Sequence, residues 1–305
     1  MTNCSPPRVG IYAPISHPYG LPPAGDVLDF VGALDDSSFD SVWVGDHLLW
    51  HGALLEATAT LAAIAAITRR VDVGTNIYLP ALRPSLVSAR TLGTIDYLSG
   101  GRLILGVGLG GDNPVEFETL GLDVHARRGL FERSLDEILQ WWSSNCDGLS
   151  GAVVQPVPAR PVPLWIGGRS DPALRRAVNR GAAAWSAHLM SVDRLRESRR
   201  RLVEYAAEQQ MPAPDTAVSV FVDVHKGPAR NEGQQFLHTH FGQDASGLGR
   251  FLVEGSVDSC LAELSRYVPL SEHILLFAAS ARPWEQLGDL SALARGLKTV
   301  QEADQ

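Results

Sequence analysis

The sequence predicts a closed (β/α)8 barrel, an α/β fold of the TIM-barrel class. Short runs rich in β-branched residues alternate with longer helical patterns along the whole chain of 305 residues. Strands that alternate with helices in this way form parallel sheets. Eight such units in about 300 residues favour a closed barrel over an open sheet. Because no change of composition marks a linker, we expect residues 1–305 to form one domain.

The first four units are predicted from apolar strand runs, each followed by apolar residues at helical spacing. Pro84 stands just ahead of the third helix, where a proline is tolerated. The predicted strands are residues 9–13, 41–45, 71–77 and 103–107, and the predicted helices are residues 26–34, 56–68, 85–98 and 127–142.

The last four units follow the same pattern. Asp171 is a good N-cap and Pro172 suits the first helical position, so the fifth helix has a clear start. The predicted strands are residues 163–166, 182–186, 217–224 and 274–277, and the predicted helices are residues 171–180, 192–209, 257–267 and 284–300.

Composition and charge exclude several classes of function. The formal net charge of −8 argues against a nucleic-acid partner. The arginine-rich segment 194–201 has helical spacing, so we interpret it as a solvated helix face. We find no signal peptide and no apolar run of membrane-spanning length. Three cysteines far apart in sequence indicate a reducing cytoplasm rather than a disulfide framework or zinc site.

Polar residues at the strand ends carry the functional prediction, because barrel enzymes place their chemistry at the carboxyl ends of the strands. Asp46 and His47 follow the second strand. They could act as an acid/base pair, or they could cap a turn and pack under a loop. Asn76 and Ile77 close the third strand after a glycine, which indicates either a bulge or an ordinary turn.

Two glycine-rich segments point to a ligand. Gly106, Gly108 and Gly111 spell G-x-G-x-x-G, the dinucleotide-binding fingerprint, but they follow the fourth strand and no helix begins directly after them. In a barrel they would instead form a shelf without side chains, suited to a planar ring. Gly167 and Gly168 precede a helix start, which favours a phosphate site over a plain tight turn.

Metal and hydrolase chemistry have little support. Asp223 and His225 form a D-x-H pattern, but two ligands are too few for a metal site, and His17 stands alone after the first strand. We therefore predict no metal. The chain carries neither a G-x-S-x-G nor a Walker sequence, so serine hydrolase and P-loop functions lack their motifs.

Four segments in order resemble the luciferase-like monooxygenase superfamily. These are barrel enzymes related to bacterial luciferase, and they use reduced FMN or the deazaflavin F420. The resemblance implies a bacterial-luciferase-like barrel and covers most of the chain. The segments are residues 41–50, 73–111, 116–129 with 135–139, and 163–185.

The resemblance implies a role for each matching residue. Asp46 and His47 match the Asp-His pair of the F420-dependent branch and are the expected catalytic residues. Asn76 and Ile77 match a bulge that often holds a non-prolyl cis peptide and backs the cofactor ring. The remaining residues expected to bind the cofactor are Gly108, Leu109 and Gly110 beside the ring, and Gly167, Gly168 and Arg169 at the phosphate.

The sequence also departs from the family pattern. One sugar-phosphate dehydrogenase branch has a glutamate acid where Gly111 stands here. The usual aspartate before Trp185 is replaced by alanine. The segment between Trp142 and Pro163 is short, which implies a small substrate lid.

We therefore expect a cytoplasmic oxidoreductase that uses F420, in preference to FMN, for hydride transfer with a small organic substrate. One alternative is a two-component monooxygenase that receives FMNH2 from a separate reductase, and another is a non-catalytic flavin-binding barrel.

Trp50, Tyr78 and Trp185 are expected to line an apolar substrate pocket. Small residues in the helix 57–67 would allow close packing between copies, so we expect a homodimer.

Overall fold

The strands close into a parallel ring. The computed structural model describes residues 5–17, 19–143, 153–226, 231–242 and 247–300. Neighbouring strands pair in parallel all around, and the last ring strand pairs with both the first and the seventh, which confirms the predicted barrel. The ring strands are β1 (Arg8–Tyr12), β2 (Ser41–Val44), β3 (Asp72–Tyr78), β4 (Leu103–Val107), β5 (Leu164–Gly167), β6 (Ala184–His188), β7 (Asp215–Val224) and β9 (His273–Ala278).

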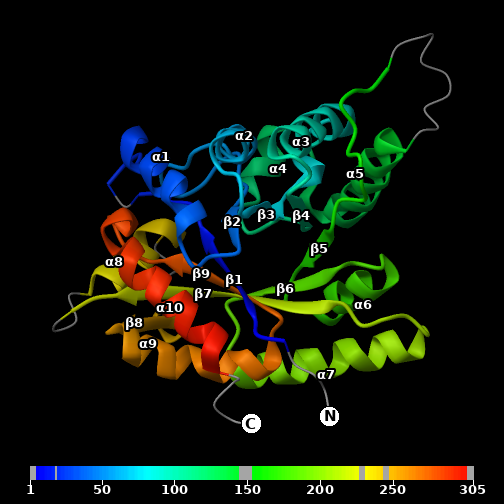
Figure 1. The fold of residues 1–305 in the computed structure, drawn as a ribbon. Helices are drawn as coiled ribbons and strands as arrows, with labels where there is room; N and C mark the ends of the chain where they lie inside the picture. Colours follow the sequence, from blue (N-terminus) through cyan, green and yellow to red (C-terminus); the bar gives the residue numbers. More distant parts are fainter. Residues whose placement is uncertain (1–4, 18, 144–152, 227–230, 243–246, 301–305) are drawn as a thin grey trace.

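Helices surround this ring, as Figure 1 shows, with α1, α2, α3 and α5 on one side of the strands and α7, α9 and α10 on the other. All eight predicted helices are present, with ends that differ by a few residues. They are α1 (Ala24–Gly32), α2 (Ala57–Ile67), α3 (Ser85–Ser99), α5 (Arg127–Trp142), α6 (Asp171–Asn179), α7 (Val192–Glu208), α9 (Val257–Leu264) and α10 (Leu287–Thr299). Short 3-10 segments span Ala33–Asp36, Pro80–Leu82, Val124–Ala126, Leu248–Phe251, Ser265–Leu270 and Pro283–Gln286.

Three elements were not predicted: α4 (Val115–Thr119), α8 (Glu232–Phe241) and β8 (Leu252–Gly255). β8 pairs with residues 221–224 of β7, beyond the section of β7 that pairs with β6. The chain therefore makes an excursion between β7 and β9 before it completes the ring. Because α8 follows the end of β7, it lies where barrel enzymes carry their sites.

Large aromatic side chains fill the ring from inside. Trp43 and Trp165 are fully buried, with ring centroids 4.5 Å apart. Glycine makes room for them, because a Cβ on Gly74 would lie 2.4 Å from the Trp43 ring and one on Gly10 would lie 2.4 Å from its Nε1. Such a core is packed solid rather than open as a pore, so ligands must bind at its mouth.

The arginine-rich segment lies on α7, and most of its arginines are in ion pairs. Arg200 bonds to Glu197 and Glu204 on the same helix, and Arg201 bonds to Glu197 and to Asp171 on α6. These exposed pairs are typical of a solvated face that is laced with ion pairs. Within the described residues, the helices are all too short or too polar to cross a membrane.

Candidate functional site

The end of β3 is broken in register and carries a non-prolyl cis peptide between Asn76 and Ile77. This confirms the expected bulge. The Asn76 amide points into the ring, where its Nδ2 donates to Tyr12 Oη (2.8 Å) and Ser219 Oγ (3.0 Å) and its Oδ1 accepts from Ser186 Oγ (2.9 Å). These partners come from β1, β7 and β6, so one side chain ties β3 to three other strands.

The buried Tyr12 hydroxyl stays protonated within this network. Burial raises the pKa of Tyr12 to about 12, more than its hydrogen bonds with Ser219 and Asn76 lower it. The hydroxyl therefore serves as a neutral donor and acceptor, and it fixes the orientation of the Asn76 amide.

Ile77 lies on the glycines of two neighbouring strands. A Cβ on Gly108 would meet Ile77 Cδ1 at 2.0 Å, and a Cβ on Gly167 would meet its Cγ2 at 2.7 Å. The absence of side chains at these positions thus accommodates the Ile77 side chain. A planar ring that approached this end of the barrel would contact Ile77 rather than the bare glycine backbone.

The Asp46 carboxylate is completely buried, and both of its oxygens accept hydrogen bonds from the protein. Both of its oxygens accept from the Arg83 guanidinium at 2.8 Å, and Oδ2 also accepts from the backbone N–H of Leu79 at 2.9 Å. Burial alone would lower the pKa of Arg83, but Asp46 outweighs it and raises that pKa. Asp46 therefore holds the segment that follows β3, and it is placed to position the site rather than to exchange protons.

His47 finds its carboxylate partner on α4 instead. Its Nδ1 lies 3.1 Å from Oε2 of Glu116, whose side chain is fully buried. Glu116 Oε1 accepts from the backbone N–H groups of Leu48 (2.6 Å) and Leu49 (3.1 Å). Burial alone would raise the pKa of Glu116, but these hydrogen bonds, that of His47 first, outweigh it and lower the pKa. A carboxylate on Nδ1 fixes the imidazole and leaves Nε2 as its other proton-carrying atom.

Trp50 covers His47 and begins an aromatic cluster. The two rings stack with centroids 3.9 Å apart. Trp50 also lies near His240 and Phe241 of α8, at 5.8 Å and 6.0 Å. Trp50 Nε1 is buried and has no hydrogen-bond partner among the residues that the structure describes, although buried donors usually have one.

The predicted phosphate site lies at the junction of β5 and α6. Gly168 has a φ of +141°, its N–H donates to Ser186, and its carbonyl accepts from Trp185 Nε1 at 2.8 Å. Arg169 is exposed, and its side chain makes no ion pair within the described residues. A free cation beside a helix N-terminus is suited to an anion.

The other predicted residues separate into two groups. Leu109 and Gly110 are half-buried at the mouth, with Leu109 packed on the core. Tyr78 and Trp185 are fully buried and belong to the core rather than to a pocket, because their polar atoms are satisfied inside it. Trp185 Nε1 donates to the carbonyl of Gly168, and the Tyr78 hydroxyl donates to Ser88 Oγ in α3.

Sequence reasoning missed Glu116, Arg83 and the mouth-facing side of α8. Glu116 is 69 residues from His47 in the chain, and no motif joins them. The available signals were the Asn113-Pro114 step, which indicates a turn and a new helix start, and the family-matching segment 116–129, which begins at Glu116. The predicted lid between Trp142 and Pro163 lies partly outside the described residues. Within them, no three His, Cys, Asp or Glu side chains gather as metal ligands.

We predict that Asp46→Asn lowers the free energy of unfolding by about 3 kcal/mol, because it leaves the buried Arg83 charge short of its main partner. Chemical denaturation measures this. As the control, Glu285→Gln removes an exposed ion pair with Arg282 and should change stability by less than about 0.5 kcal/mol. Equal, small effects of both variants would contradict the positioning role of Asp46.

Relatives of known activity match parts of this chain. The F420-dependent glucose-6-phosphate dehydrogenase of Amycolatopsis mediterranei is 32% identical over 157 residues, which cover 46% of this chain and 46% of that protein. The match with the first three such dehydrogenases thus spans about half of their length. The 4-hydroxyprotoasukamycin monooxygenase of Streptomyces nodosus subsp. asukaensis is 28% identical over 241 residues, covering 71% of this chain and 63% of that protein.

Solved structures share the fold. An F420-dependent secondary alcohol dehydrogenase in complex with an F420-acetone adduct has a TM-score of 0.80 at 18% identity, covering 96% of this chain and 99% of that one. The oxygenating constituent of 3,6-diketocamphane monooxygenase from Pseudomonas putida, in complex with FMN, has a TM-score of 0.70 at 16% identity, covering 96% and 97%.

A family model matches most of the chain. The model of the luciferase-like monooxygenase family covers residues 7–266. It takes in the broken end of β3, the glycines beneath Ile77 and the His47–Glu116 pair. The chain therefore belongs to the luciferase-like monooxygenase family.

Proposed function

We propose that this protein is an oxidoreductase that binds F420 and transfers a hydride between the deazaflavin and a small organic substrate. The observation that carries the proposal is the His47 imidazole at the barrel mouth, held at Nδ1 by the buried Glu116 carboxylate. Relatives named as F420-dependent dehydrogenases and as 5,10-methylenetetrahydromethanopterin reductases support it.

The residues present fit such a cofactor. Ile77 presents an apolar surface to a ring, and the glycines beneath it could not be replaced without displacing it. Gly167, Gly168 and Arg169, which has no ion pair within the described part of the chain, stand at the N-terminus of α6, where a phosphate would bind. F420 supplies hydride chemistry when bound, and the protein supplies orientation and electrostatics.

His47 would handle the proton that accompanies the hydride. With Nδ1 bonded to Glu116, neutral Nε2 accepts the hydroxyl proton of an alcohol that is oxidised. In the reverse direction, a protonated Nε2 donates to the carbonyl oxygen of a ketone. The buried carboxylate holds the imidazole by Nδ1 in both directions.

A second candidate is an FMNH2-dependent monooxygenase supplied by a separate reductase. It is favoured by one observation, that the relative matched over 71% of this chain is named a monooxygenase. Its cofactor would use the same Ile77 surface and the same phosphate site. The two candidates therefore differ in the cofactor that is bound and not in the architecture of the mouth.

Equilibrium binding distinguishes them. We expect the purified apoprotein to bind F420 with a micromolar or lower Kd and FMN much more weakly, as followed by ring fluorescence in both oxidation states. Arg169→Ala should weaken F420 binding about tenfold because it removes a charged phosphate contact. The control is Arg133→Ala, at an exposed arginine of α5, and it should leave the Kd for F420 unchanged. Preference for reduced FMN would support the monooxygenase, and binding of neither cofactor would refute both candidates.

The Glu116 pair is tested in the turnover of any substrate that is found. Glu116→Gln keeps an acceptor oxygen for Leu48 but loses the charge, so kcat should fall between about tenfold and a hundredfold while KM and the cofactor Kd stay within about threefold. Glu116→Asp should restore part of kcat. The control, Glu118→Gln, lies on the exposed side of α4. A rise in KM at constant kcat would mean that Glu116 serves binding alone.

We also propose a homodimer formed through α2 and α3. The helix α2 carries small residues. Its neighbour α3 exposes four large apolar side chains, more than a helix facing only water would carry. They are Leu86, Val87, Tyr97 and Leu98. We expect light scattering to give twice the monomer mass, and Val87→Arg to halve it. Val203→Arg, at an exposed valine of α7, is the matched control. A monomeric wild type at tens of micromolar would refute the dimer.

A further inference from the structure

A buried polar atom at the end of β6 has no partner in the protein. Nδ1 of His188 makes no hydrogen bond with any residue that the structure describes. His188 is the last residue of β6, so it stands at the carboxyl end of a ring strand, where barrel enzymes bind their ligands. Because buried polar atoms normally have a partner, an unpaired one at this place points to a bound ligand.

The His188 side chain faces the inside of the ring. Alternate residues of a strand share a face, so His188 lies on the same face as Ser186, whose hydroxyl donates to Asn76. On the neighbouring strand, His188 pairs with Ser219 of β7, which accepts from Asn76 Nδ2 at 3.0 Å. His188 is therefore the next inward-facing residue of β6 after Ser186, on the side of the barrel mouth.

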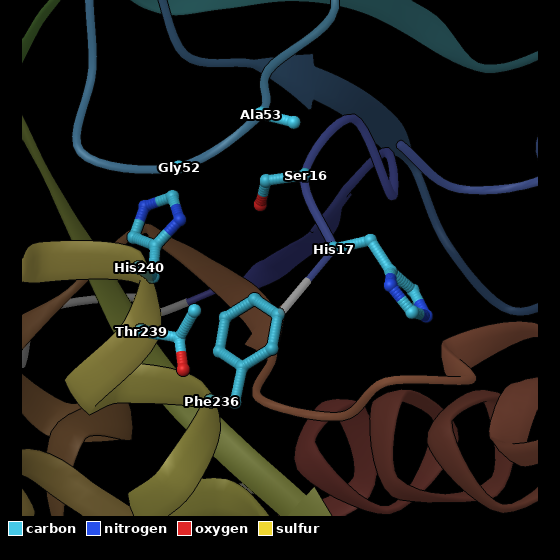
Figure 2. A pocket seen from close by; sticks show the side chains of 7 residues that line it. All are labelled: Ser16, His17, Gly52, Ala53, Phe236, Thr239 and His240. Carbon is cyan, nitrogen blue, oxygen red and sulfur yellow. The ribbon is translucent and has the colours of Figure 1, made fainter. Parts of the chain in front are cut away.

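Aromatic rings close the side of His188 that faces β7 and α8. Its ring meets Phe221 edge-on, with centroids 5.4 Å apart, and lies 6.4 Å from Phe241 of α8. Figure 2 shows the rest of this side, where Phe236 and His240 of α8 lie against the loops after β1 and β2. His188 does not line the depression between them. A ligand of His188 must therefore reach it from the opposite side, along β5.

The end of β5 joins the surface of Ile77 to Arg169. β5 pairs with β6 in parallel up to Gly167. Two residues further along both strands, Arg169 is level with His188. Ile77 covers Gly167, and Gly168 adds no side chain. A ligand that extends from Ile77 to Arg169 therefore runs along the end of β5, with His188 beside it on β6.

His188 is uncharged at neutral pH. Burial first, and then Arg169, lowers the pKa of His188 to about 4, although Asp112 acts in the opposite direction. Arg169 acts on this pKa through space, so its charge lies near the imidazole. A phosphate would pair with the charge of Arg169, and the neutral imidazole is suited to an uncharged polar group.

The loop after β6 holds His188 in place. Leu189 has a φ of +52°, a left-handed conformation that is uncommon for a residue with a side chain. The next carbonyl, that of Met190, accepts from the Tyr267 hydroxyl at 3.1 Å. His188 is thus presented in a fixed position, as a preorganised binding group is.

We propose that His188 binds the cofactor, and that its Nδ1 makes a hydrogen bond with a hydroxyl of the ribityl chain that joins the ring to the phosphate. The inference rests on the proposed function and adds a contact between the ring surface at Ile77 and the phosphate site at Arg169. In both F420 and FMN this connecting chain carries hydroxyls. A hydroxyl both donates and accepts, so it pairs with either neutral tautomer of His188.

Binding of two probes tests this contact: F420, and the same deazaflavin ring with a methyl group in place of the ribityl chain and all that follows it. We expect His188→Phe to weaken F420 binding about fivefold, because one hydrogen bond between neutral groups is lost. The Kd of the methyl-substituted ring should change by less than about twofold. His188→Asn, which keeps a polar atom near the position of Nδ1, should bind F420 within about twofold of the wild type. Ring fluorescence gives each Kd, and thermal melting verifies folding.

The control is His273→Phe, at the first residue of β9 and thus at the other end of the ring, and it should leave the Kd for F420 unchanged. An unchanged F420 Kd in folded His188→Phe overturns this inference alone. So does equal weakening of both probes, or a loss in His188→Asn as large as in His188→Phe.

Wild-type binding is measured first, which separates this inference from the proposed function. If FMN binds in place of F420, the same comparison is made with FMN and lumiflavin, because both cofactors contain the ribityl chain. If neither cofactor binds, the proposed function is refuted and this inference with it.

Discussion

The geometry of the barrel mouth depends on the hydrogen bonds of one buried amide. Asn76 uses both ends of its side chain to hold strands β1, β6 and β7 against the broken end of β3. A buried amide that lost these partners would pay the full cost of desolvation, so the network has few alternatives. Through it the next residue, Ile77, is placed over Gly108, just after β4, and Gly167 of β5, and its side chain forms the surface at this end of the barrel.

Buried carboxylates then arrange the loops around that surface. Asp46 binds Arg83 and the backbone of Leu79, while Glu116 binds His47 and the backbone of the loop after β2. Each carboxylate joins segments that are far apart in sequence and is itself buried. The mouth is thus built by polar bonds on a core of aromatic residues, which is the arrangement a preorganised site requires.

The fold could be predicted because short apolar strand runs alternate with longer helical segments all along the chain. Asp46, His47 and the bulge at Asn76 were found because they end predicted strands. The partner of His47 could not be found, since its contact joins residues 69 positions apart and depends on the path of the loops. α8 was missed because its histidines and glutamines interrupt the apolar period, and Tyr78 and Trp185 were misplaced because aromatic residues serve pockets and cores alike.

The position of α8 has a consequence for how such a barrel can diversify. Ring closure depends on β7 and β9, which pair over six residues of each strand. α8 and β8 belong to the excursion between them and contribute no strand to the closed ring. Exchange of this segment between homologous chains would therefore leave the His47–Glu116 pair and the packing of Ile77 intact. The closed ring and the α8 segment at its mouth are therefore encoded in separate stretches of sequence, so a change in one need not alter the other.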